Sequence, residues 1–230
     1  EIKRPEHLIA WWSRIFSFYV PDEKDLIPLR SLCRLFRDSL TMPIWTTFPH
    51  PKYPTLNCLL DKLNNVYQND STKAPKIVFI MKGTFQGNNS LVSINYPLIM
   101  IGAGQNRTFL TGYPLRIGGT KEDGKEVVVQ DLSSSGAENG LSGNNGLSFL
   151  CTRMTFTQCR MYYGVIAQKT KGRIINCVIT QCGMSGICSS MNGLIELEGD
   201  QTKVDGNVTS RRNGDYGLYT HSPSSTIHLL

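Results

Sequence analysis

Short apolar segments recur in a fixed order between Met154 and Gly199. Thr-Gln-Cys closes two of them, at Cys159 and again 23 residues later at Cys182. The next two segments also repeat: Gly164-Val-Ile-Ala is matched by Gly186-Ile-Cys-Ser, and Gly172-Arg-Ile-Ile by Gly193-Leu-Ile-Glu. Self-similarity at such a period is typical of a solenoid. The segments are short and rich in Val, Ile, Phe and Thr, so each repeat is expected to be one coil of three parallel strands. The pattern predicts a mainly β protein, a right-handed single-stranded parallel β-helix.

Similar apolar runs surround the repeat and extend the predicted solenoid. Lys76–Gly83 is nearly continuous in apolar residues, as expected for a strand buried on both faces. The other predicted strands lie at 91–94, 98–102, 108–112, 115–118, 127–131, 146–159, 216–220 and 226–230. Residues 133–145 are rich in Gly, Ser and Asn, and they predict an exposed loop.

The first third of the chain follows a different, helical period. Apolar residues three or four apart predict two short helices within residues 7–40 and a third over Leu56–Tyr67. The prolines within residues 42–56 predict an irregular linker. We therefore divide the chain into an α-helical segment (1–48), a linker with a capping helix (49–75) and the β-helix (76–230).

The N-terminal helices resemble an F-box. The resemblance covers residues 7–40, and its most specific part is Leu32-Cys-Arg-Leu-Phe-Arg37. It implies that the segment docks the Skp-family adaptor and the cullin complex of a ubiquitin ligase. The residues that would line the adaptor contact are Leu8, Ile15, Phe16, Leu26, Leu29 and Leu32. Alternatively, the same helices close the first coil, because solenoids need caps at their ends.

A second resemblance bears on possible chemistry. Ile99-Met-Ile-Gly-Ala-Gly104 resembles the start of pectate-lyase-like (pectin-lyase-like) β-helices, which implies polysaccharide binding or cleavage. Such enzymes need clustered carboxylates, and the predicted strands offer only Asp131, Glu196 and Glu198. Glu196 and Glu198 are two apart and share a strand face, and we interpret them as a solvated edge. We assign no catalytic, cofactor-binding or metal-binding residue.

Composition bears on possible partners and on the cell compartment. The net charge of +6 is modest for 230 residues. The sequence contains no aromatic–basic strip, so a nucleic-acid partner is not expected. Five of the seven cysteines lie in the repeat, where Cys159 over Cys182 and Gln158 over Gln181 would stack. We expect free, core-packed thiols and hence the cytoplasm or another reducing intracellular compartment, with a disulfide framework as the alternative. No apolar run is long enough to span a membrane.

Three functional hypotheses follow. The first is a non-enzymatic protein-binding module, an F-box-like substrate receptor whose β-helix is the recognition surface. The second is a structural subunit, held by neighbouring subunits of a larger assembly. The third is a polysaccharide-binding or polysaccharide-cleaving β-helix.

Overall fold

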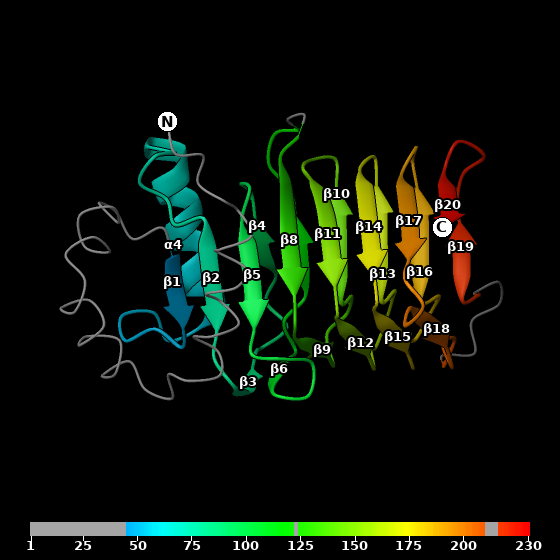
Figure 1. Cartoon of the computed structure of the whole chain (residues 1–230), viewed down its shortest axis with the longest axis horizontal. Helices are drawn as coiled ribbons and strands as arrows, with labels where there is room; N and C mark the ends of the chain where they lie inside the picture. The colour runs from blue at the N-terminus through cyan, green and yellow to red at the C-terminus, as the bar shows by residue number, and fades with distance from the viewer. Residues whose placement is uncertain (1–44, 122–123, 210–215) are drawn as a thin grey trace. The chain divides into compact units, whose positions relative to one another are not determined.

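Parallel strands stack into a β-helix along most of the chain. The computed structural model describes residues 45–121, 124–209 and 216–230, and these belong to one compact unit, Trp45–Leu230. Three parallel sheets run along the solenoid, and from β2 (Ile77–Ile80) onward each coil gives one strand to each sheet in turn (Figure 1). The predicted fold class, a parallel β-helix, is confirmed.

The longest sheet has eight strands, and we call it the long sheet. Its strands, in spatial order, are β1 (Trp45–Phe48), β2 (Ile77–Ile80), β5 (Ile99–Gly102), β8 (Glu126–Gln130), β11 (Ser148–Thr152), β14 (Lys171–Ile175), β17 (Leu194–Glu198) and β20 (Thr226–Leu229).

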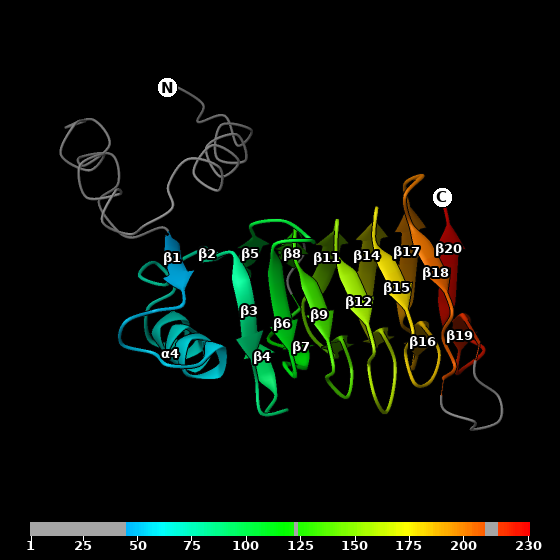
Figure 2. The ribbon, with the colours of Figure 1, turned by 90° about the horizontal axis from the view of Figure 1, so that it is seen from below.

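The other two sheets have six strands each. The β3 sheet contains β3 (Gly83–Gln86), β6 (Thr108–Thr111), β9 (Ser133–Ser135), β12 (Thr155–Thr157), β15 (Val178–Thr180) and β18 (Lys203–Asp205). The β4 sheet contains β4 (Val92–Ile94), β7 (Leu115–Ile117), β10 (Leu141–Asn144), β13 (Val165–Gln168), β16 (Ile187–Ser190) and β19 (Leu218–Thr220). Figure 2 shows the β3 sheet running along the solenoid.

The core consists of columns of inward side chains that follow the strand register. In the long sheet one such column passes from coil to coil through Met100, Val129, Cys151, Ile174 and Leu197, all buried. Alternate residues of the same strands point outward, because successive side chains of a strand face opposite sides. Each coil therefore packs its inward apolar residues against one another and against the neighbouring coils, as in other solenoids.

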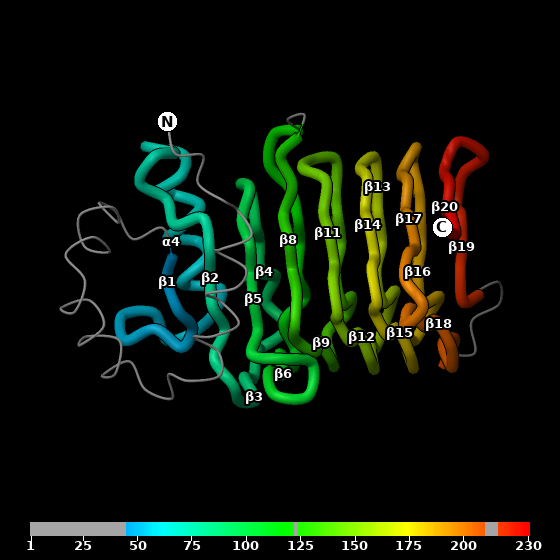
Figure 3. The backbone as a smooth tube through the Cα atoms, in the orientation of Figure 1, coloured from blue at the N-terminus to red at the C-terminus, as the bar shows by residue number. Residues whose placement is uncertain are grey.

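The coils turn at three kinds of corner, and each kind repeats a left-handed backbone conformation. Four corners of one kind, which follow the long sheet, have positive φ at Asp131, Arg153, Asn176 and Gly199. Those after the β3 sheet have it at Gly112, Gly136, Gln158, Gln181 and Gly206. Those after the β4 sheet have it at Gly119, Asn145, Lys169 and Met191. Because the corners are equivalent, successive coils stack in register (Figure 3).

One helix, α4 (Leu56–Asn69), packs on the first coil. The Thr55 hydroxyl accepts a hydrogen bond from the Cys58 N–H at 3.2 Å and caps the helix start. Leu56, Leu59, Leu60 and Leu63 are buried in the solenoid core. Asn64 joins the helix to β4, because its amide donates to the Ser93 carbonyl at 2.9 Å and accepts from the Asn95 N–H at 3.0 Å. The predicted helix is thus confirmed.

Two predictions for local structure were wrong. Residues 133–145 were expected to form a loop, yet they contribute β9 and β10, because backbone register with the neighbouring coils outweighs the low strand propensity of Ser and Gly. Residues 42–56 were expected to be irregular, yet Trp45–Phe48 pair with β2 as β1.

One aligned pair in the repeat was also wrong. Gly172 lies opposite Ile195, not Gly193, because the corner before β17 holds Gly193 and shifts the register by two residues. The space above Gly172 is filled by the ring of Phe149, its partner in β11.

Candidate functional site

A cluster of charged side chains lies on the outer face of the long sheet. Glu196 of β17 accepts from the Lys171 ammonium at 2.7 Å, and its other oxygen lies 3.7 Å from the Arg173 guanidinium. Arg173 also donates to Glu198 at 3.3 Å. The pairs form because β14 and β17 are in register, with Arg173 directly opposite Glu196.

This geometry decides how the two predicted carboxylates behave. Glu196 and Glu198 do share a strand face, but Arg173 contacts both of them. Each carboxylate is therefore engaged with a basic side chain of β14 across the ladder, and the two do not form an isolated carboxylate pair. Arg173 and Glu196 are 23 residues apart, which equals the period of the repeat. The alignment of Gly172 with Gly193 concealed this pair of opposite charges in the sequence.

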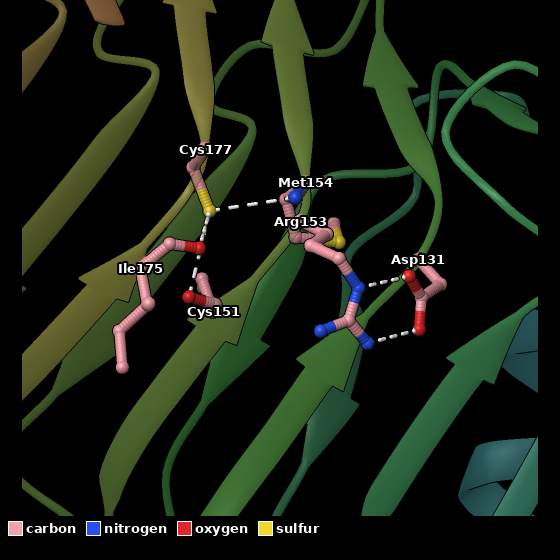
Figure 4. A network of polar contacts seen from close by, with 6 residues as sticks. All are labelled: Asp131, Cys151, Arg153, Met154, Ile175 and Cys177. Carbon is pink, nitrogen blue, oxygen red and sulfur yellow. Dashed lines mark hydrogen bonds and ion pairs between the residues drawn. The ribbon is translucent and has the colours of Figure 1, made fainter. Parts of the chain in front are cut away.

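Asp131 belongs to a separate ion pair at the neighbouring corner. The Arg153 guanidinium donates to both carboxylate oxygens of Asp131, each at 2.6 Å (Figure 4). The hydrogen bond to Asp131 raises the pKa of Arg153. Both residues have positive φ at successive corners, so the two-bond contact links one coil to the next.

Beside this pair lies a buried thiol network. The Cys177 sulfur lies 3.3 Å from the Ile175 carbonyl oxygen and 3.4 Å from the Cys151 carbonyl oxygen, and the Met154 N–H donates to it at 3.4 Å. Figure 4 shows these contacts. Burial raises the pKa of Cys177 to about 11. A thiol that is neutral and held by the backbone is a weak nucleophile, so this network serves to join coils.

A second group of side chains surrounds the corner that follows the β3 sheet. An open depression of about 590 Å³ is lined there by Gln158, Cys159, Arg160, Gln181, Gly206 and Thr209. The predicted stacking of the repeat is confirmed at this corner, because Thr157 lies opposite Thr180 and both glutamines adopt the left-handed conformation.

Cys159 lines this depression, and its buried thiol interacts with that of Cys182. This interaction, with burial, raises the pKa of Cys159, whereas the same interaction lowers the pKa of Cys182. None of the six cysteines in the described part of the chain forms a disulfide, and five of them are buried.

The remaining predicted residues are placed as follows. The six proposed adaptor contacts, Leu8, Ile15, Phe16, Leu26, Leu29 and Leu32, lie outside the described residues. Within the described ranges, no group of three or more His, Cys, Asp or Glu side chains could hold a metal ion. The same part of the chain contains no helix with the length and apolar character to span a membrane.

Comparison with known proteins adds no family to this description. No protein-family model matches the chain, and no curated protein or solved structure matches it. The function is therefore argued from the chain's own residues.

Proposed function

We propose that the chain is a protein-binding module, an F-box-like substrate receptor in which the β-helix recognises the substrate and the N-terminal segment docks a Skp-family adaptor and its cullin complex. The docking residues are those of the F-box resemblance: Leu8, Ile15, Phe16, Leu26, Leu29 and Leu32. The β-helix contributes a rigid support, because every coil is fixed by the register of three sheets.

One observation favours a binding function over a catalytic one. The strand and corner carboxylates that could act as an acid–base pair, Asp131, Glu196 and Glu198, are each matched with a basic side chain. A glycosidase instead keeps two carboxyl groups in different protonation states across a gap of roughly 5–10 Å. Matched charges on a regular sheet are suited to holding coils together and to presenting a fixed polar surface.

The experiment compares partners recovered with the full chain and with a double variant. Leu29→Asp with Leu32→Asp places two charges in the proposed adaptor contact, and we expect recovery of the adaptor and cullin to fall at least about tenfold. Arg30→Asp is the matched control, since Arg30 lies on the other predicted face of the same helix. Circular dichroism and thermal unfolding verify that the β-helix of each variant is folded.

Two results would contradict this proposal. The first is recovery of one fixed assembly that contains no cullin. The second is equal adaptor recovery with wild type and the double variant.

A structural subunit is the second candidate, and a specific observation favours it. On β20 and just after it, Leu229 and Leu230 are 71% and 73% exposed, and Leu218 of β19 is also exposed. Apolar side chains of this size at a sheet edge suit a neighbouring subunit. Stoichiometric co-purification with such an assembly would support this candidate.

A further inference from the structure

Cys159 and Cys182 occupy equivalent positions in successive coils. Each follows a left-handed glutamine at the same corner. The Gly183 N–H donates to the Cys159 carbonyl at 2.7 Å, which is the bond expected when Cys159 and Cys182 lie directly opposite each other in a parallel ladder. Neighbouring strands are about 4.8 Å apart, and a disulfide needs Cα atoms roughly 4.4–6.8 Å apart.

The two sulfurs also point the same way. The Cys159 thiol faces the Thr157 carbonyl at 4.0 Å, and the Cys182 thiol faces the Thr180 carbonyl at 3.6 Å. Since Thr157 and Thr180 are register partners, the thiols are placed alike one coil apart.

Two glycines give the sulfurs their space. A Cβ on Gly140 would lie 3.2 Å from the Cys159 sulfur, and a Cβ on Gly164 would lie 3.0 Å from the Cys182 sulfur. Leu141 and Val165, the residues after these glycines, are register partners, so the glycines repeat with the coil as the cysteines do.

The open depression lies beside the pair. It is lined by Cys159 and by the exposed Arg160 and Gln158, while Cys159 and Cys182 are both buried. A hydroperoxide therefore reaches the sulfurs when this corner opens, and the Arg160 charge favours the anionic species that form.

We infer that Cys159 and Cys182 form a redox modification site, in which a hydroperoxide converts the two thiols into a disulfide that joins two successive coils. The Cys182 thiolate attacks one peroxide oxygen, the O–O bond breaks, and the other oxygen leaves as hydroxide and takes up a proton. The Cys182 sulfenic acid formed is then attacked by the Cys159 sulfur, which loses its proton as water leaves. With hydrogen peroxide, two thiols and one peroxide give one disulfide and two waters. This site is independent of the proposed adaptor function.

Cys151 and Cys177 provide a comparison within the same protein. Both are buried, but Cys151 lies opposite Ile174, and the Cys177 sulfur contacts the Cys151 carbonyl rather than its thiol. Backbone groups hold the Cys177 sulfur on its other contacts (Figure 4). These two cysteines are therefore expected to remain thiols under the same treatment.

The test treats the folded full chain with hydrogen peroxide, alkylates the remaining thiols and maps linked peptides by mass spectrometry. We expect one linked pair, Cys159 with Cys182, which a reductant reverses. The thermal midpoint of the oxidised chain should rise by roughly 6–12 °C, because the bridge closes a loop of intermediate length in the unfolded state.

Cysteine variants distinguish the proposed disulfide from oxidation of other thiols. Cys182→Ser and Cys159→Ser should each abolish the link and the thermal shift, whereas Cys177→Ser should keep both. If peroxide modifies the exposed Cys58 while Cys159 and Cys182 are recovered alkylated, the inference is overturned. A link that forms equally fast in urea-unfolded chain would overturn it as well, since the stacked geometry would then contribute nothing.

Discussion

A serine lies in the apolar core of the β3 sheet. Ser134 stands between Leu110 and Phe156 in an inward column, and its hydroxyl has no hydrogen-bond partner among the described residues. A buried hydroxyl without a partner costs free energy. Ser134→Ala should therefore raise the free energy of unfolding by about 1 kcal/mol, measured by urea titration.

The neighbouring residue is its control. The Ser133 hydroxyl donates to the Gln105 carbonyl at 2.6 Å. Ser133→Ala should lower the free energy of unfolding by about 1 kcal/mol. Equal losses in the two variants would mean that the Ser134 hydroxyl does have a partner.

Cys177 links the stability of the solenoid to alkaline pH. Its pKa is raised by burial from 9.0 to about 11, so the unfolded chain loses this proton first. The stabilisation is complete below pH 9 and is lost as the pH rises through 11, by about 2–3 kcal/mol in all. Cys177→Ser removes the titrating group, so its unfolding free energy should fall less between pH 8 and pH 11 than that of the wild type. Parallel curves for the two proteins would refute this assignment.

At the scale of the strand, one aromatic ring packs between neighbouring coils and between two sheets. Phe149 of β11 fills the space above two glycines, Gly172 of β14 and Gly143 of β10. A Cβ on Gly172 would lie 2.3 Å from the Phe149 ring. Gly172→Ala should therefore cost about 1–3 kcal/mol of unfolding free energy, since the core cannot expand freely.

A double-mutant cycle identifies the ring as the cause. Phe149→Leu removes part of the crowding, so the cost of Gly172→Ala should be smaller in that background, by about 1 kcal/mol or more. Additive costs would show that the strain lies elsewhere.

These strands also show what the sequence could and could not predict. The period of 23 residues was enough to predict the fold, because Thr-Gln-Cys repeats at equivalent corners. The register of β14 with β17 could not be predicted from this period. Gly172 leaves space for the ring of Phe149 from another coil, whereas Gly193 lies at a corner, so the two glycines are not equivalent. β9 was missed because its Ser-Ser-Ser sequence becomes a strand only when neighbouring coils supply its hydrogen bonds. Among the site residues, the stacked Cys159 and Cys182 could be predicted, but the charge pairs around Arg173 could not.

For the whole molecule, stability should propagate from coil to coil, with the first coil protected by α4. Asn64 is buried and makes hydrogen bonds in both directions with β4. Asn64→Ala should cost about 1–3 kcal/mol and speed amide hydrogen exchange in β2, β3 and β4, while β14 and β17 keep their protection.

Asn57 serves as the control on the same helix. It donates to the Ser90 and Leu91 carbonyls but is more exposed, so Asn57→Ala should cost less. If Asn64→Ala speeds exchange uniformly along the solenoid, the coils unfold as one cooperative unit and the cap has no local role.

The repeated left-handed corners also bear on how such a chain can change its length in evolution. Removing the 23 residues from Arg160 to Cys182 would join Cys159 to Gly183, whose N–H already bonds to the Cys159 carbonyl. A whole coil is therefore a natural unit of insertion or deletion, because both ends of the gap meet at a strand spacing. Phe149 limits this freedom: the deletion would place Ile195 beside its ring in place of Gly172, so the shortened chain would need a smaller residue there.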